Sequence, residues 1–389
     1  MVAGRLQVKK GYYYVVLQLQ DVDGKHYSKW ISTGLKEKGN KKRAEAQLVE
    51  ERKKYSLMPV KNSMSDMLFT DYMLKWLSIV KPKLAVTTYS AYESMVRRVI
   101  VPYFMPKRLK LQEVSDFILD EFYVSQSERV KQRTVVHYHA VIHKALEYAV
   151  KKKIIGRNPA DDVDRPKAEK FSAGFYNSTE VAEMFTVVKG TKLEIPVLFA
   201  AFYGLRRSEV VGLKWSAIDF EKNTISITHT FTSCYSNGKR VEVPRDRTKN
   251  ESSKRTLPLV EPVKKRLLEL AKEQKENKRL CGECYCKDYE GYICVNEIGK
   301  IIKPDYISET FPKVLEENGL RRIRFHDLRH SCASLLVSNG VPMKQVQEWL
   351  GHSDFSTTAN IYSHLEYSTK QKSAEAMTEG LGLALSILL

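Results

Sequence analysis

The spacing of apolar residues changes along the chain, and this change constrains the fold more than any other feature of the sequence. Over residues 5–34 apolar and polar residues alternate, which predicts a three-stranded antiparallel sheet with a turn at residues 21–24. A segment rich in Lys, Arg, Glu and Ala at residues 41–55 then predicts one helix. We therefore expect a small first module built from a sheet and a helix.

The apolar period becomes helical in the next part of the chain. The predicted helices span residues 65–80, 87–101 and 130–150. Thr87 is the expected cap of the second helix, and the Gly-Arg-Asn-Pro sequence at residues 156–159 ends the third. Residues 161–171 are charged and contain a proline, so they predict the linker to the next domain.

The rest of the chain mixes the two periods. Ser178 is the expected cap of a first helix, and residues 194–215 predict a second. Strands of one small sheet are expected at residues 223–231, 241–243 and 255–259. Further helices are expected at residues 261–275, 306–318, 326–338, 342–350 and 356–364.

These patterns together predict a multi-domain α+β protein with three domains. Residues 1–57 form a small three-stranded β-sheet plus helix, and residues 62–165 form an all-helical domain. Residues 172–389 form a mainly helical domain with a small antiparallel sheet.

The charge of the chain is strongly positive and unevenly distributed. The 389 residues carry a formal net charge of +18, of which +7 lies in residues 1–60, +7 in residues 61–170 and +4 in residues 171–389. Excess cations in the first two regions suit surfaces that neutralise phosphates, so nucleic acid is the expected partner. The alternative is a basic protein tuned for solubility.

The sequence carries no sign of a membrane or secretory protein. Residues 1–10 contain no apolar signal-peptide core, and no apolar run approaches the ~20 residues that a bilayer span needs. The six cysteines do not resemble a secreted disulfide framework. We therefore expect a cytoplasmic protein without a membrane partner.

Four of the cysteines cluster late in the chain, at Cys281, Cys284, Cys286 and Cys294. Four thiolates can hold a tetrahedral Zn²⁺, but standard sites use paired arms about a dozen residues or more apart. Cys294 also falls in an expected strand at residues 292–295, where a cysteine is often simply buried. The sequence leaves open whether this cluster binds zinc.

Four short segments of the last domain combine residues that carry chemistry. They are Gly-Leu-Arg-Arg-Ser-Glu at residues 204–209, Thr-Lys at 248–249, His-Asp-Leu-Arg-His at 326–330, and Leu-Gly-His at 350–352 followed by Tyr362. Each residue type alone is more often a packing or solvated side chain. The joint order and spacing of the segments are much more specific.

In this order and spacing the segments resemble the catalytic boxes of the tyrosine recombinases, also called the phage integrase family. The resemblance extends over essentially the whole chain, because residues 62–165 look like the family's core-binding domain and residues 1–57 like the arm-binding domain of conjugative-transposon and phage integrases. It implies a site-specific DNA recombinase that integrates and excises a mobile element. The catalytic residues that it implies are Arg206, Lys249, His326, Arg329, His352 and Tyr362. Tyr203, where many members have threonine, is a departure at an expected packing position.

The chemistry of DNA strand transfer asks for these residue types. A phosphodiester breaks through a phosphorane with extra negative charge on its non-bridging oxygens, and the guanidinium forks of Arg206 and Arg329 suit that charge. Attack by the phenolic oxygen of Tyr362 would form a 3′-phosphotyrosyl link that keeps the bond energy for rejoining. Neither a nucleotide nor a metal cofactor is therefore expected.

Protons also move in this reaction. Lys249 matches the family's lysine and is expected to protonate the departing 5′-oxygen. His326 and His352 are expected to contact phosphoryl oxygens or to help accept the Tyr362 proton, and the sequence does not decide which histidine is the base. Glu209, on the same expected helix as Arg206, is expected to orient an arginine or a backbone amide.

The resemblance also implies partners. They are double-stranded DNA at core and arm sites, further copies of the chain in a tetrameric synapse, and an excisionase or host DNA-bending protein as a candidate accessory factor. The apolar end of the chain, residues 373–389, is expected to contact a neighbouring subunit in trans, with packing on its own domain as the alternative.

Two other functions stay open at the level of sequence. A monomeric type IB topoisomerase would share the phosphotyrosine chemistry, but the separate arm-like domain and the apolar tail argue against it. A non-catalytic DNA-binding regulator would keep the fold alone, and the intact set of six catalytic residues argues against that function.

Overall fold

The computed structural model describes residues 3–20, 26–57, 66–164, 174–236, 238–246, 254–351 and 377–378. The chain divides into two compact units, residues 1–170 and 171–389. The boundaries of the three expected domains stay predictions, since residues 58–65 and 165–173 lie outside the described residues.

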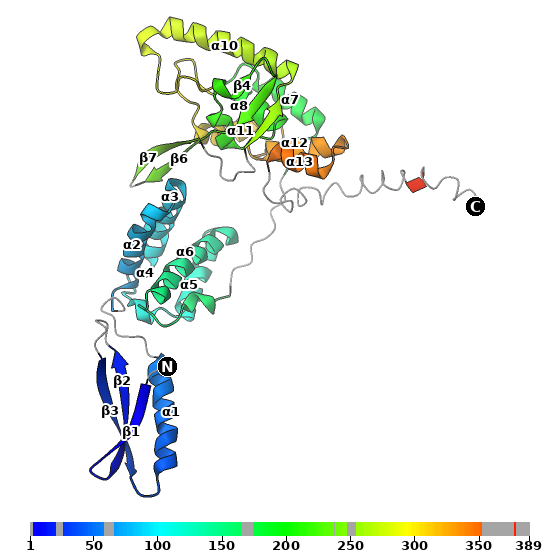
Figure 1. The fold of residues 1–389 in the computed structure, drawn as a ribbon. Helices are drawn as coiled ribbons and strands as arrows, with labels where there is room; N and C mark the ends of the chain where they lie inside the picture. Colours follow the sequence, from blue (N-terminus) through cyan, green and yellow to red (C-terminus); the bar gives the residue numbers. More distant parts are fainter. Residues whose placement is uncertain are drawn as a thin grey trace, which may run out of the picture. The chain divides into compact units, whose positions relative to one another are not determined.

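The N-terminal module is a three-stranded antiparallel sheet with one helix against it (Figure 1). Its elements are β1 (Ala3–Lys9), β2 (Tyr12–Gln20), β3 (His26–Lys36) and α1 (Lys41–Leu57), with the strands in the order β1-β2-β3. The helix covers the sheet face on which Gly4 and the buried Leu17 pair, and Leu48 of α1 lies beside Gly4. The predicted strands and helix are confirmed, while the predicted turn at residues 21–24 lies outside the described residues.

The following part of the first unit is helical. Its helices are α2 (Phe69–Val80), α3 (Val86–Met95), α4 (Val101–Phe104), α5 (Asp116–Ser127) and α6 (Gln132–Lys151), with a π-helical turn at Val96–Ile100. Short 3-10 turns lie at Lys81–Lys83, Leu111–Glu113 and Pro159–Asp161. The helices share one apolar core that includes Phe104, Phe122 and Ile142. Within this core the Tyr72 hydroxyl donates to the Ala145 carbonyl at 2.6 Å, which satisfies the polar end of a buried ring.

One helix of this part was not predicted, and one expected cap is wrong. The sequence patterns did not predict α5, whose N-cap Ser115 accepts a hydrogen bond from the Ile118 amide at 3.3 Å. Thr87 does not cap α3, because the helix already begins at Val86 and its N-cap position is Ala85. A hydroxyl inside the first turn lies beyond the position from which a cap accepts the free amides.

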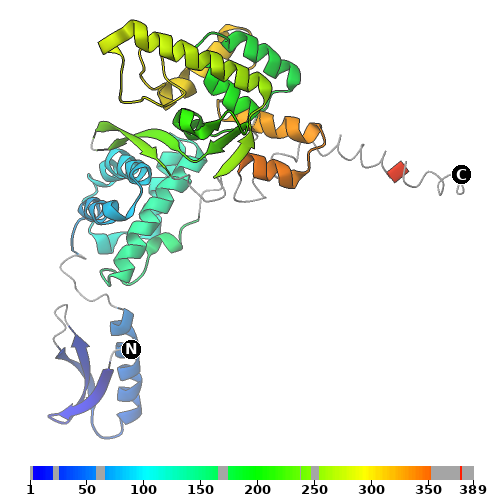
Figure 2. The same cartoon turned by 45° about the horizontal axis from the view of Figure 1, so that its top comes forward.

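The second unit is mainly helical with small antiparallel sheets (Figure 2). Its helices are α7 (Ser178–Val188), α8 (Glu194–Phe202), α9 (Arg207–Gly212), α10 (Glu261–Cys281), α11 (Pro304–Glu317), α12 (Asp327–Ser338) and α13 (Met343–Leu350). Its strands are β4 (Ile218–Asp219), β5 (Thr224–Ile227), β6 (Thr230–Ser236), β7 (Lys239–Arg245) and β8 (Arg255–Pro258), and 3-10 turns lie at Trp215–Ala217 and Gly282–Cys284. One core, which includes Phe199, Val210 and Phe311, joins most of these elements, and a smaller one of Cys332, Ala333, Val346 and Leu350 joins α12 to α13.

The expectation of a single small sheet is wrong. The strand predicted at residues 223–231 breaks after Ile227, so that β5 pairs with β4 and β8 while β6 pairs with β7. The β6–β7 hairpin closes at Gly238, whose φ of 74° suits a tight turn. A local hairpin therefore takes β6 away from the sheet that β5 forms.

Helix boundaries also differ from those expected. The helix predicted at residues 194–215 divides into α8 and α9, with Gly204 between them. Asn177, rather than Ser178, caps α7: its side chain accepts from the Glu180 amide at 2.9 Å, and the Glu180 carboxylate accepts from the Asn177 amide at 2.8 Å. This reciprocal pair is a capping box.

Two further expectations concern the C-terminal part of the chain and the possibility of a membrane span. The helix expected at residues 356–364 lies outside the described residues. In the parts of the chain that the structure describes, no helix is long and apolar enough to cross a membrane.

Candidate active site

The turn between α8 and α9 sets the position of Arg206. Gly204 adopts a φ of 62°, a left-handed conformation that ends the preceding helix. A side chain at this position would also collide with Leu350 of α13, so the site needs glycine for space as well as for its backbone. Arg206 follows at the N-cap of α9.

Arg206 is held by Glu209 in the first turn of α9. Its backbone N–H donates to Glu209 Oε2 at 3.0 Å, and its guanidinium Nη1 donates to Oε1 at 2.7 Å. The other guanidinium nitrogen, Nη2, donates to the carbonyl of Gly351 at 3.0 Å. Glu209 thus contacts both an arginine and a backbone amide, as its spacing predicted.

Arg329, on α12, is the largest of the fully buried side chains among the described residues. Its Nη1 donates to the Gly204 carbonyl at 2.6 Å and its Nη2 to the Leu350 carbonyl at 2.7 Å. Burial, followed by the charge of Arg206, lowers the pKa of Arg329 to about 9, so the guanidinium is still charged at neutral pH.

Arg255, the first residue of β8, joins the same cluster, and the sequence analysis missed it. Its Nε donates to the Trp349 carbonyl at 2.7 Å and its Nη2 to Glu209 Oε2 at 3.2 Å. The signal that could have found it is the strand alternation, which places Arg255 on the same face as the buried Leu257. A cation that points inward needs partners.

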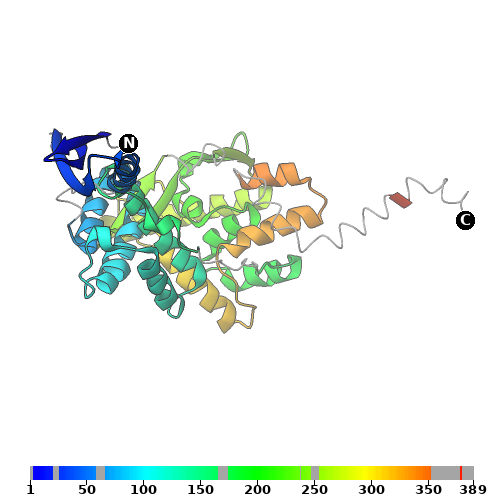
Figure 3. The ribbon, with the colours of Figure 1, turned by 90° about the horizontal axis from the view of Figure 1, so that it is seen from below.

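The C-terminal end of α13 is where the three arginines meet, and α12 and α13 are the orange helices of Figure 3. Three successive carbonyls, those of residues 349–351, accept from Arg255, Arg329 and Arg206 in that order. The last carbonyls of a helix lack intrahelical donors and form its negative end, so guanidinium groups stabilise them. Gly351, with a φ of 67°, ends the helix at this point.

The electrostatics of the cluster combine attraction and repulsion. Burial alone would raise the pKa of Glu209, but Arg255, then Arg206 and Arg329, lower it overall, so the carboxylate is ionised. The arginines also act on one another, because the charge of Arg206 contributes to lowering the pKa of both Arg255 and Arg329. A bound anion would relieve this repulsion.

His326 lies at the N-cap of α12, with its ring edge-on to that of His330 at 5.6 Å. The ring reaches the surface, yet the protein around it is dense enough that burial lowers its pKa to about 4, with His330 and then Arg329 adding to the effect. It is therefore neutral at pH 7 and able to accept a proton. Asp327, which accepts from Arg324 Nη2 at 2.6 Å, steadies the same loop.

Tyr203 packs under the end of α13, as predicted. It is fully buried, its ring stacks on Trp349 with centroids 6.0 Å apart, and its hydroxyl donates to the Pro258 carbonyl at 3.2 Å. The larger ring thus fills space between α13 and β8.

Three of the six predicted catalytic residues, Lys249, His352 and Tyr362, lie outside the described residues. The described chain brings Arg206 and Arg329 together at the end of α13 and places His326 at the start of the helix that carries Arg329. His352 directly follows Gly351 in the sequence. The positions of the other three side chains stay predictions.

The clustered cysteines do not form a metal site in the part of the chain that the structure describes. Cys284 is exposed, whereas Cys294 is buried, and burial raises the pKa of its thiol to about 12. No group of three or more His, Cys, Asp and Glu side chains among the described residues is placed to hold a metal ion. Residues 292–295 also form isolated bridges rather than the expected strand.

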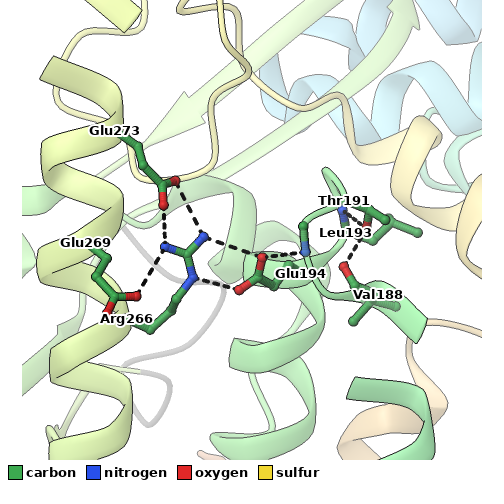
Figure 4. Close-up of polar contacts among 8 residues, drawn as sticks. Val188, Thr191, Leu193, Glu194, Arg266, Glu269 and Glu273 are labelled. Atoms are coloured by element: carbon green, nitrogen blue, oxygen red, sulfur yellow. Dashed lines mark hydrogen bonds and ion pairs between the residues drawn. The ribbon is translucent and has the colours of Figure 1, made fainter. Parts of the chain in front are cut away.

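A second arginine-centred cluster lies between α10 and the start of α8 (Figure 4). Arg266 donates from Nε to Glu194 Oε1 at 2.6 Å and from Nη1 to Glu273 Oε1 at 2.8 Å, and Glu269 lies 3.9 Å from Nη1. Glu194 also accepts from the Gly190 amide at 2.9 Å. This cluster contains none of the predicted catalytic residues and joins two helices.

The sheet face opposite α1 in the N-terminal module carries aromatic and basic side chains. Trp30 is 45% exposed, Tyr14 lies edge-on to it at 6.2 Å, and the Lys9 ammonium lies 5.6 Å from its ring centre. Arg5 shares this face, since it pairs with Val16, which pairs with Trp30. Basic groups around an exposed indole suit contact with nucleic acid.

Comparison with known proteins agrees with this architecture. Residues 177–369 match the "Phage integrase family", and residues 68–123 match "Phage integrase, N-terminal SAM-like domain". A tyrosine recombinase XerC-like protein of Caldanaerobacter subterraneus is 27% identical, over 87% of this chain and 90% of the relative. The ICEBs1 integrase of Bacillus subtilis is 26% identical, over 73% of this chain and 75% of the relative.

Solved structures share the fold. The Tn1549 transposon integrase in complex with a circular intermediate DNA has a TM-score of 0.65 at 17% identity, over 80% of this chain and 99% of that one. A lambda integrase dimer bound to a core site has a TM-score of 0.57 at 16% identity, over 92% of this chain and 93% of that one.

The chain therefore belongs to the phage integrase family, the tyrosine recombinases. It is an enzyme, a DNA strand transferase whose activity is site-specific recombination by an integrase. The two alternatives, a type IB topoisomerase and a non-catalytic regulator, are not favoured by relatives that are named recombinases and integrases.

Proposed function

We propose that this integrase cuts and rejoins DNA with Tyr362 as nucleophile and with Arg206 and Arg329 as ligands of the scissile phosphate. The observation that carries the proposal is that these two arginines, one at the N-cap of α9 and one on α12, meet on the carbonyls at the end of α13. Arg329 also donates to the carbonyl of Gly204, two residues before Arg206, although Gly204 and Arg329 are 125 positions apart in the sequence.

The proposed cleavage is a direct displacement at phosphorus. The Tyr362 oxygen forms a bond to phosphorus, the bond to the 5′-oxygen breaks, and a 3′-phosphotyrosyl link results. Charge develops on the non-bridging oxygens, where the guanidinium groups of Arg206 and Arg329 stabilise it. The mutual repulsion of the clustered arginines favours this added negative charge. Attack of a 5′-hydroxyl on the link reverses the step and rejoins DNA, so no nucleotide is consumed.

Three residues are proposed to move or hold protons. Lys249 protonates the departing 5′-oxygen, and His326 or His352 accepts the proton of Tyr362. The lowered pKa of His326 supports its neutral form, which proton acceptance requires.

We also propose double-stranded DNA and other copies of the chain as partners. The lambda integrase was solved as a dimer on a core site and as a tetramer on a Holliday junction, and the Tn1549 integrase with a circular intermediate DNA. A tetramer on core sites would integrate and excise a mobile element. In this tetramer residues 373–389 of one subunit would contact a neighbouring subunit. An excisionase or a host DNA-bending protein is a candidate accessory partner.

The N-terminal sheet is proposed to bind arm sites through the face that carries Trp30. Trp30→Ala should weaken arm-site binding by roughly 5- to 30-fold, since truncation of an aromatic side chain at the centre of an interface commonly costs about 1–2 kcal/mol. Val49→Ala, at an exposed position of α1, is the control and should change little. Equal affinities of the two variants in a titration with labelled arm DNA would refute this use of the sheet.

The nucleophile is tested by covalent trapping. Nicked DNA with the ends of the encoding element would be incubated with wild type, Tyr362→Phe and the neighbouring control Tyr367→Phe. We expect a covalent adduct with wild type and Tyr367→Phe and none with Tyr362→Phe, while all three still bind the site, because only the attacking oxygen is lost. Mapping of the adducted peptide identifies the tyrosine. An adduct that persists in Tyr362→Phe would exclude it as nucleophile.

A further inference from the structure

Arg255 stands in the same cluster as the proposed phosphate ligands but outside the motifs that predicted them. It opens β8, where it pairs with Ile227, and its side chain is only 7% exposed. A guanidinium buried to this extent is costly unless its donors are used. Its position and its contacts therefore need an explanation beyond surface charge.

The contacts of Arg255 connect three elements. From β8 it donates to Glu209 on α9 and to the Trp349 carbonyl on α13. The Glu209 carboxylate, which accepts the hydrogen bond from Arg255, also accepts hydrogen bonds from the backbone N–H and the guanidinium of Arg206. Arg255 thus touches one proposed phosphate ligand through a shared carboxylate and the end of α13 directly.

The end of α13 is fixed from several sides. Arg329 and Arg206 donate to the carbonyls of Leu350 and Gly351, and the Tyr203 ring stacks on the Trp349 side chain. Arg255 completes this arrangement by holding the Trp349 carbonyl. The residue that leaves this fixed end is His352.

We propose that Arg255 is a positioning residue for strand transfer, which holds the end of α13, directly before His352 in the sequence, without touching DNA. This inference rests on the proposed function, because it takes His352 to be part of the catalytic set. A planar fork that donates in two directions suits this task, and a lysine ammonium on a flexible stem does not reproduce it. Small displacements of a catalytic group are enough to slow a reaction strongly.

The test is a mutant cycle on cleavage of nicked core-site DNA at saturating protein. The variants are Arg255→Lys, His352→Ala and the double variant, with Arg266→Lys as a matched control in the other arginine cluster. DNA affinity and melting temperature are measured beside the single-turnover rate of covalent adduct formation. Should Arg255→Lys not fold, Arg255→Gln replaces it in the same cycle.

We expect Arg255→Lys to lower the cleavage rate about 10- to 100-fold with little change in DNA affinity. In the His352→Ala background the same change should cost about 3-fold or less, because groups that act through one another are not additive. Arg266→Lys should leave the rate within about 2-fold of wild type. Amide hydrogen exchange in the last turn of α13 should be faster in Arg255→Lys than in wild type.

A second substrate separates positioning from direct phosphate contact. A methylphosphonate at the scissile position lacks one charged oxygen, so loss of a phosphate ligand matters less on it. We expect the deficit of Arg255→Lys to be the same on both substrates. If the deficit disappears on the methylphosphonate, Arg255 acts on the charged oxygen, directly or through Arg206, and the inference is wrong.

The cycle also separates this inference from the proposed function. If His352→Ala cleaves as fast as wild type, the assignment of His352 fails. The other outcome is that His352→Ala cleaves slowly, as the proposed function expects. If Arg255→Lys then lowers the cleavage rate by the same factor in the wild-type and His352→Ala backgrounds, or in neither, the positioning role of Arg255 fails while the proposed function stands.

Discussion

The second unit contains two networks of arginine and glutamate side chains, and they differ in which charge is in excess. At the end of α13, Arg206, Arg255 and Arg329 gather around Glu209. Between α10 and α8, Arg266 gathers Glu194, Glu269 and Glu273 around itself (Figure 4). The first network concentrates cations around one carboxylate, and the second concentrates carboxylates around one cation.

The difference appears in the direction of the pKa shifts. Burial and the charge of Arg206 lower the pKa of Arg255 and of Arg329. Hydrogen bonds that Arg266 donates to the Glu194 carboxylate raise the pKa of Arg266 despite its partial burial. A cluster of cations under mutual repulsion is prepared for an anion, whereas Arg266 is already neutralised and serves to join helices.

The largest expected effect comes from removing a cation of the first network. Arg329→Ala and Arg206→Ala should each lower the rate of covalent adduct formation by about 10²–10³-fold, which is typical for loss of a donor to developing charge. Arg266→Ala should lower it less than about 2-fold. Single-turnover assays on nicked core DNA measure these rates. Equal losses of cleavage rate from substitutions in both networks would show that the difference between the networks has no role in catalysis.

Lys249 sharpens the comparison, because its proposed task is to give up a proton, which an arginine does not do at neutral pH. Lys249→Ala should lower cleavage of ordinary DNA by about 10²-fold. A 5′-phosphorothiolate substrate, whose sulfur leaves without protonation, should restore most of the rate. The same substrate should not restore Arg329→Ala, and a missing rescue of Lys249→Ala would remove the lysine as the acid.

The second network should matter for stability rather than for rate. Arg266→Ala should lower the free energy of unfolding by about 1 kcal/mol or less at pH 7, as expected for a partly exposed ion pair. Burial opposes ionisation of Glu194, but hydrogen bonds from Arg266 and the Gly190 amide lower its pKa below the usual 4.5. The folded form of Glu194 therefore holds its proton less tightly than the unfolded form.

That difference fixes the sign of the pH dependence. The contribution of Glu194 is present above pH 4.5 and is lost as the pH falls below it. The difference in melting temperature between wild type and Arg266→Ala should therefore be largest near neutral pH and shrink in acid. A constant difference between pH 7 and pH 3 would contradict the pairing.

The smallest expected effect is a shift in the titration of His326. In DNA-free protein its NMR signal should titrate near pH 4, since burial and then His330 and Arg329 oppose its protonation. Arg329→Ala should raise that midpoint modestly, whereas Arg266→Ala should leave it unchanged. Because the unfolded histidine titrates near 6.5, stability is expected to fall as the pH drops from that value toward 4. A wild-type midpoint near 6.5 would show that the protein around the ring does not oppose its protonation.

The agreement between sequence and structure is best where local signals decide. The alternation at residues 5–34 correctly predicted β1, β2 and β3, and the helical periods predicted most of the helices. The spacing of Glu209 correctly predicted its contact with Arg206. These features depend on side chains a few positions apart, whose geometry a strand or a helix sets directly.

The failures share a different cause. The pairing of β6 with β7 instead of β5, and the break at Gly204, depend on which elements pack against one another. Capping was misplaced by one residue at Asn177, where polar neighbours compete for the same position. Single-residue choices of this kind are decided by the surrounding contacts.

The sequence by itself determined the class of the protein, most of its helices and strands, and the identity of the residues that are proposed to carry the chemistry. Only the tertiary structure decided how these residues share one cluster, since Arg206 meets Gly351 across 145 positions and Arg329 meets Gly204 across 125. The structure also showed that Arg255, which lies outside the recognised motifs, contacts Glu209 and Trp349. Contacts of such range follow from the packing of whole helices and strands, and no local spacing of residues encodes them.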